Sequence, residues 1–115
     1  MLDPPGFSGH NVSFESFAMG IPVVAWANAP FLRGRFTLGL YRTMALTDCL
    51  ADSADGFVDI AWRLVHDGGF RAAMRRAIAD RSPAIFDDLA VVRAHEAFWT
   101  QAVERSRAEI RFGKG

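Results

Sequence analysis

The sequence predicts a mixed α/β fold, in which short parallel strands alternate with helices and three helices follow the last strand. A small-residue loop at Ser8-Gly9 runs into a short helical stretch that ends at Gly20, and the apolar run Val23–Trp26, typical of a buried strand, follows at once. Helical periodicity then dominates the second half of the chain. Because strands joined by helices pair in parallel, we expect right-handed crossovers.

The first helix is expected to follow a strand end and a loop. Met1–Asp3 resembles the last residues of a strand, and the loop over 4–9 is rich in Pro, Gly and Ser. Asn11 is a residue type that caps helix N-termini, so we expect it to start the helix as its cap. Gly20 favours the end of this helix, and Pro22 prevents its continuation.

A second helix, a short strand and an amphipathic helix are expected in the middle of the chain. Residues 31–44 have helical spacing, although Gly34 and Gly39 each weaken a helix by about 1 kcal/mol relative to Ala. Asp48–Ala51 is too short for a helix and is expected to be a strand. Asp52-Ser53 can cap the helix that follows, whose apolar residues recur every three or four positions: Phe57, Ile60, Ala61, Leu64 and Val65.

Two further helices are expected in the C-terminal part. Gly68-Gly69 is expected to stop the amphipathic helix, and another helix is expected over residues 70–80. Ser82-Pro83 breaks that helix, because proline lacks the backbone N–H that a helix needs. A long last helix is expected over residues 88–110.

Composition argues against several functional classes. The 115 residues include 13 Lys and Arg and 13 Asp and Glu, so binding of nucleic acid through bulk charge is not expected. No apolar run reaches the roughly 20 residues of a membrane span, so no membrane partner is expected. The single cysteine, Cys49, fits a reducing compartment, and we expect a cytoplasmic protein. The histidines and the cysteine show no metal-ligand spacing, so no metal site is predicted.

The stretch over residues 9–15 is the candidate ligand site. A helix N-terminus led by Gly9 gathers unpaired backbone N–H groups and the positive end of the helix dipole, so it suits a phosphate. Glu15 lies one turn into the helix, near enough to accept hydrogen bonds from sugar hydroxyls. Ligands of parallel sheets bind outside the carboxyl ends of strands, where the loop over 4–11 is expected. These residues indicate half of a nucleotide site.

Several segments follow one another in an order shared with a known family. They are Leu2-Asp3, Gly9–Glu15, Met19–Val24, Arg35, Cys49–Ala51, the helix over 60–67, Ser82-Pro83 and Phe86-Asp87, which together span nearly the whole chain. This order resembles the C-terminal half of GT-B glycosyltransferases. The nearer resemblance is to the O-linked N-acetylglucosamine transferase family, including its SPINDLY branch.

The resemblance implies the C-terminal portion of a Rossmann-like nucleotide-sugar-binding domain, so residues 1–115 are expected to be a partial domain of a larger GT-B protein. It implies that Glu15 binds the ribose and that Arg35 faces the cleft. Independently of the resemblance, Phe7 in the first loop is a candidate to stack on a base or sugar. The family usually has Thr where Asn11 and Val12 stand, so Val12 can contact a ligand through its backbone only. The implied diphosphate contacts are Gly9, His10, Asn11, Val12 and Ser13.

The implied activity is transfer of N-acetylglucosamine from a UDP donor onto Ser or Thr hydroxyls of a protein acceptor, without a metal or cofactor. A tetratricopeptide-repeat region upstream in the full protein is a further expected partner. No catalytic base is identified, and the 115 residues alone are expected to be inactive, because the family's acceptor domain and much of its donor site precede this region. Two alternatives stay open: a non-catalytic protein-interaction or oligomerisation module, and another GT-B enzyme that acts on a lipid or glycan.

Overall fold

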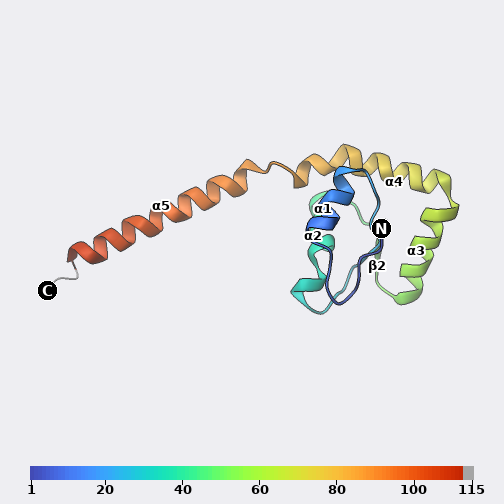
Figure 1. Ribbon diagram of the computed structural model, residues 1–115, viewed down its shortest axis with the longest axis horizontal. Helices are drawn as coiled ribbons and strands as arrows, with labels where there is room; N and C mark the ends of the chain where they lie inside the picture. Colours follow the sequence, from blue (N-terminus) through green and yellow to red (C-terminus); the bar gives the residue numbers. More distant parts are fainter. Residues whose placement is uncertain (113–115) are drawn as a thin grey trace.

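A computed structural model describes residues 1–112 and shows a small α/β body from which one long helix projects (Figure 1). The described part measures 72 × 29 × 19 Å along its principal axes. In chain order, the elements are α1 (Asn11–Ala18), β1 (Ala25–Trp26), the 3-10 helix η1 (Leu32–Gly34), α2 (Phe36–Thr43), β2 (Leu50–Ala51), α3 (Ala54–His66), α4 (Gly68–Arg81), the 3-10 helix η2 (Ser82–Ile85) and α5 (Leu89–Phe112).

The sheet consists of two short parallel strands and one additional parallel bridge. β1 pairs with β2 so that Ala25 lies opposite Leu50 and Trp26 opposite Ala51. On the other side of β1, Leu2 bridges to Val24 in parallel. The three segments therefore run in the same direction, with α1 and α2 as the connections between them, which confirms the mixed α/β fold expected from the sequence.

The end of α1 explains the Gly20-Ile21-Pro22 sequence. Gly20 has a φ of +64°, a left-handed conformation that glycine adopts without the steric penalty of a Cβ atom. Its N–H donates to the carbonyl of Phe17, and the N–H of Ile21 donates to the carbonyl of Ser16. These two bonds form a Schellman motif, which ends the helix and turns the chain towards β1.

The continuous helix expected over residues 31–44 is wrong, because η1 and α2 divide this stretch at Arg35. A Cβ atom at Gly34 would lie 2.9 Å from the carbonyl oxygen of Pro5, so the loop over 4–9 packs directly against the backbone here. The Arg35 side chain donates to the carbonyls of Ala29 and Pro30, at 2.6 and 3.2 Å. These tertiary contacts hold the backbone at the break, and helical spacing alone does not reveal them.

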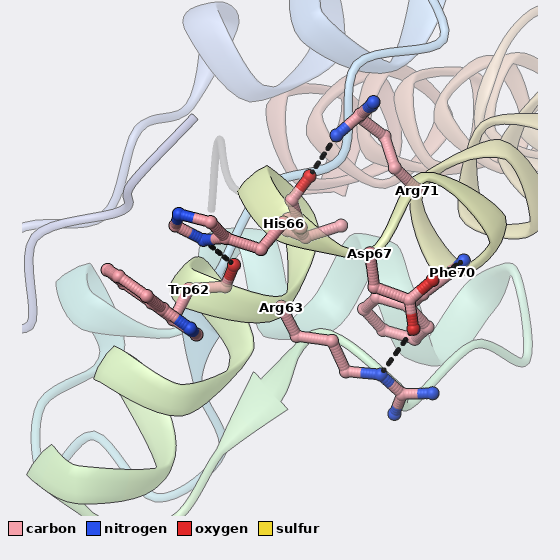
Figure 2. A network of polar contacts seen from close by, with 7 residues as sticks. Trp62, Arg63, His66, Asp67, Phe70 and Arg71 are labelled. Atoms are coloured by element: carbon pink, nitrogen blue, oxygen red, sulfur yellow. Dashed lines mark hydrogen bonds and ion pairs between the residues drawn. The ribbon is translucent and has the colours of Figure 1, made fainter.

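The stop expected at Gly68-Gly69 is also wrong, because both glycines lie in the first turn of α4. Asp67 ends α3 and caps α4 through a 2.9 Å bond from the N–H of Phe70 to its carboxylate (Figure 2). This bond, with a smaller contribution from Arg63, holds the pKa of Asp67 below its ordinary value. Arg71 donates to the carbonyls of Leu64 and Val65 at the end of α3, each at 2.8 Å. One capping residue therefore joins two helices at a sharp corner without an intervening loop.

The core lies between the sheet and helices α1, α2 and α4. Tyr41 of α2 is fully buried, and its hydroxyl donates to the carbonyl of Val23 at 2.7 Å and accepts from the Val23 N–H at 3.0 Å. Burial raises the pKa of Cys49 to about 11, and this free thiol packs at the centre of the core. The other buried core residues are Phe17, Ala25, Met44, Leu46, Met74 and Ile78.

The helix expected over residues 88–110 extends from Leu89 to Phe112 and projects away from the body (Figure 1). No side chain between residues 89 and 110 is buried. Within residues 1–112, no helix is both long and apolar enough to cross a membrane.

Candidate functional site

The candidate site is built from two loops that follow parallel strand segments. The loop over 4–10 leads from the bridge at Leu2 into α1, and the loop over 27–35 leads from β1 into α2. The N–H of Ser8 donates to the carbonyl of Arg33 at 2.9 Å, and the Arg33 side chain donates back to the carbonyl of Gly6 at 3.2 Å. The two loops therefore lie together at the carboxyl ends of adjacent strands, where parallel sheets place their ligands.

A buried polar cluster lies beneath these loops. The Asp3 carboxylate accepts from the Ser8 hydroxyl and from the Gly9 N–H, both at 2.6 Å. The Thr37 hydroxyl lies 2.9 Å from the Ser8 hydroxyl and 2.7 Å from the Ser13 hydroxyl. Asp3, Ser8, Ser13 and Thr37 are all buried, and we call them the polar cluster. Buried polar groups need such partners, so the cluster fixes the path of the loop.

The start of α1 presents backbone donors to solvent. Asn11 is the first helical residue rather than the cap, and the preceding His10 makes no side-chain capping bond, so the expectation that Asn11 caps the helix is wrong. The Ser13 hydroxyl turns inward instead and donates to the carbonyl of Gly9 at 2.5 Å. In the stretch that the structure describes, no hydrogen bond uses the N–H of residues 10–13. Ser13 is fully buried, so the donors that remain available at the positive end of α1 are the three N–H groups of the exposed residues 10–12.

The side chains around these donors differ in their exposure. His10, Asn11 and Val12 are exposed, whereas the Ser13 hydroxyl is committed to the polar cluster. The His10 ring packs against Phe36 of α2, with ring centroids 4.5 Å apart. Since Ser13 is fully buried and its hydroxyl is bonded within the protein, it supports the helix start rather than facing a ligand.

Glu15 lies on α1 one turn beyond the free donors. Its side chain is exposed, and no polar partner holds its carboxylate within residues 1–112. A free carboxylate on the same helix as the donors can accept hydrogen bonds from two hydroxyls of a bound sugar.

Arg35 and Phe7, the two remaining candidates from the sequence, differ in whether their side chains are free to contact a ligand. The Arg35 guanidinium is occupied by the carbonyls of Ala29 and Pro30, so in this conformation it supports the loop. Phe7, 67% exposed, stands on the surface of the first loop and is free to stack against a ligand. Across the described chain, no group of three or more His, Cys, Asp or Glu residues is arranged to hold a metal ion.

Three residues of this region were not identified from the sequence: Ser8, Arg33 and Thr37. Ser8 and Thr37 are 29 positions apart, and their contact depends on how α2 packs beside α1. Arg33 is the first basic residue of the chain, after 32 residues without Lys or Arg. Its isolated position in the sequence is the only signal of its bond to the Gly6 carbonyl in the first loop.

Comparison with known proteins gives one structural relationship. No protein-family model matches the chain, and no curated protein matches it. Among solved structures, the chain is similar to a mutant of the O-GlcNAc transferase of Thermobaculum terrenum, with a TM-score of 0.71 and 26% sequence identity. The match covers 91% of this chain and 21% of that one, so the chain spans about a fifth of the length of the structure it matches. In fold, the chain therefore corresponds to part of a GT-B glycosyltransferase of the O-GlcNAc transferase kind, which confirms the resemblance found in the sequence.

Proposed function

We propose that this chain is part of the nucleotide-sugar-binding domain of a glycosyltransferase and that the start of α1 holds the diphosphate of the donor. The observation that carries the proposal is the set of three unpaired N–H groups at the exposed residues 10–12, beside a loop at the carboxyl end of a parallel strand segment. The structural similarity to an O-GlcNAc transferase over 91% of the chain supports it. Helix N-termini of this kind bind phosphate through their N–H groups and dipole.

The proposed division of roles follows from the side chains. Gly9, His10, Asn11 and Val12 border the diphosphate, and Val12 contributes through its backbone alone, whereas the buried Ser13 supports the helix start from beneath. Glu15 binds the ribose hydroxyls, because its carboxylate is exposed and free of other partners among the described residues. Phe7 is a candidate for stacking on the base or sugar, and Arg35 is assigned to loop support rather than to ligand contact.

The proposed chemistry is direct displacement with inversion at the sugar carbon. As the bond from the sugar to the diphosphate breaks, negative charge grows on the leaving group, and preorganised N–H groups stabilise that charge. The donor is proposed to be UDP-N-acetylglucosamine, and the acceptor a Ser or Thr hydroxyl of a protein. The catalytic base and the acceptor site are proposed to lie outside these 115 residues. We also propose a cytoplasmic location, which the buried free thiol of Cys49 suits.

A non-catalytic interaction module is the second candidate, and the exposed apolar side chains of α5 favour it. Leu89 is 64% exposed, Trp99 is 61% exposed, and Val92, Phe98 and Val103 are exposed on the same helix. Such a helix suits contact with a protein surface. The two candidate functions differ in nucleotide binding: a glycosyltransferase donor site requires it, whereas an interaction module does not.

Titration of the chain with UDP, followed by NMR, tests the proposed donor site. We expect a dissociation constant of about 1 mM or weaker, worth about 4 kcal/mol, because only part of a donor site is present. The Glu15→Ala variant should weaken UDP binding at least fivefold, since it removes the acceptor for the ribose hydroxyls. The matched control is Glu104→Ala on α5, which removes an exposed carboxylate far along the chain and should leave binding unchanged.

Two results would count against the proposal. UDP binding that is equally strong in wild type and Glu15→Ala removes the ribose assignment. Absence of UDP binding at concentrations well above 1 mM favours the interaction module.

A further inference from the structure

We propose that Thr37 is a positioning residue, which fixes the start of α1 in the orientation that presents the N–H groups of residues 10–12 to a diphosphate. This inference rests on the proposed donor site and assigns a role to a residue of α2 that touches no ligand itself. Thr37 is fully buried, so its hydroxyl acts only on the protein groups that surround it.

The hydroxyl of Thr37 lies at the centre of the polar cluster. Its oxygen is 2.9 Å from the Ser8 hydroxyl, 2.7 Å from the Ser13 hydroxyl and 3.2 Å from the Gly9 carbonyl. The Thr37 N–H also donates to the Ser8 hydroxyl at 3.0 Å. One side chain thus contacts the last part of the loop and the first turn of α1 at the same time.

The Ser8 hydroxyl donates its one hydrogen to the Asp3 carboxylate, so it accepts in its contacts with the hydroxyl and the N–H of Thr37. Either hydroxyl can donate in the contact between Thr37 and Ser13, and both hydroxyls also reach the Gly9 carbonyl. Without the Thr37 hydroxyl, Ser8 keeps the Thr37 N–H and Ser13 keeps the Gly9 carbonyl, but the group that joins the loop to the helix start is lost. The loss of buried hydrogen bonds is costly.

The position of Thr37 on α2 connects the cluster to the core. Thr37 and Tyr41 are four residues apart and lie on the same face of the helix. Tyr41 holds this face to both backbone groups of Val23, next to β1. Thr37 extends this rigid contact by one turn to the ligand loop. The same helix face thus anchors to the sheet at one end and orients the candidate diphosphate site at the other.

The test compares Thr37→Val, Thr37→Ser and a control, Thr43→Val. Valine keeps the shape of threonine but has no hydroxyl, whereas serine keeps the hydroxyl. Thr43 lies on the same helix, is exposed, and its hydroxyl donates only to the carbonyl of Gly39. The probes are UDP and inorganic pyrophosphate, and hydrogen exchange of the amides of residues 9–13 is measured on each variant.

We expect Thr37→Val to weaken the binding of both probes at least fivefold and to speed amide exchange over residues 9–13 by at least tenfold. Thr37→Ser should restore both within twofold, and Thr43→Val should change neither. If Thr37→Val does not fold, Ser13→Ala removes the neighbouring hydroxyl and should weaken both probes in the same direction.

The outcomes separate this inference from the function on which it rests. If wild type binds the probes and folded Thr37→Val binds them equally well, the positioning role is wrong and the proposed donor site stands. If wild type binds neither probe, both are overturned. A loss of affinity that Thr37→Ser does not restore also contradicts the positioning role, because it would come from altered packing rather than from the lost hydroxyl.

Discussion

Gly34 shows how a single residue controls the approach of the two loops of the candidate site. A Cβ atom added there would lie 2.9 Å from the carbonyl oxygen of Pro5 and 3.0 Å from Cβ of Ala29. The Pro5 oxygen belongs to the backbone of the first loop, so it cannot move aside without displacing that loop. The size of this residue, rather than its backbone freedom, sets the spacing between the loops.

Gly34→Ala should therefore destabilise the chain by about 1–3 kcal/mol, the usual range for overpacking. The measurement is the free energy of unfolding from urea denaturation. Gly39→Ala is the matched control, because nothing lies within 4 Å of a Cβ atom at this helical position. It should stabilise the chain by about 1 kcal/mol. Equal effects of the two substitutions would show that the loops do not pack as described.

At the same scale, the sequence predicts which residue types end or cap a helix better than it predicts the groups to which their side chains bond. Gly20 and Ser53 act as the helix stop and the helix cap that the sequence predicts. Asn11 does not act as the predicted cap, because the helix begins one residue earlier than expected, with His10 in the cap position, and the Ser13 hydroxyl ties this start to the Gly9 carbonyl and to Thr37. Local capping rules omit such a tertiary partner, which is why this detail required the structure.

At the scale of elements, the corner between α3 and α4 depends on the charge of Asp67. The N–H of Phe70 favours the ionised carboxylate and lowers its pKa, with support from Arg63 (Figure 2). A group whose pKa is lower in the folded state contributes stability above its unfolded pKa, about 3.9 for Asp. That contribution is lost as the pH falls through the lower, folded value.

The difference in unfolding free energy between wild type and Asp67→Asn should therefore depend on pH. Asparagine keeps an acceptor oxygen for the Phe70 N–H but cannot ionise. Denaturation between pH 2 and pH 6 should show wild type gaining stability relative to the variant as the pH rises towards about 4–5, then no further gain. A constant difference over the whole range would exclude a stabilising role for the Asp67 charge.

The helices were predicted better than their junctions. Periodicity revealed α3, α4 and α5, because their apolar residues recur at helical spacing. The break at Arg35 and the direct passage from α3 to α4 depend on side-chain bonds, from Arg35 to Ala29 and from Phe70 to Asp67. Such bonds form only when distant or successive segments are already in place, so a pattern of hydrophobicity does not contain them.

At the scale of the whole molecule, the candidate site lies at one edge of a small parallel sheet, where the loops over 4–10 and 27–35 meet. The match to 21% of an O-GlcNAc transferase chain agrees with the sequence resemblance, and the free donors of residues 10–12 lie within the stretch where that resemblance puts the diphosphate. The exposed face of α5 stands apart from this site, at the far end of the molecule (Figure 1). The sequence predicted the location of the site from its local order, whereas the support beneath it, through Thr37 and Arg33, appeared only in three dimensions.

The central claim is that the N–H groups of residues 10–12 bind a diphosphate. Spectra of the ¹⁵N-labelled chain, recorded during addition of UDP and separately of uridine, test it most directly. We predict that UDP shifts the amide resonances of residues 10–12 progressively, whereas uridine at the same concentration leaves them unchanged because it has no phosphate. Shifts with UDP that map to α5 or elsewhere, or equal shifts with uridine, would contradict the claim.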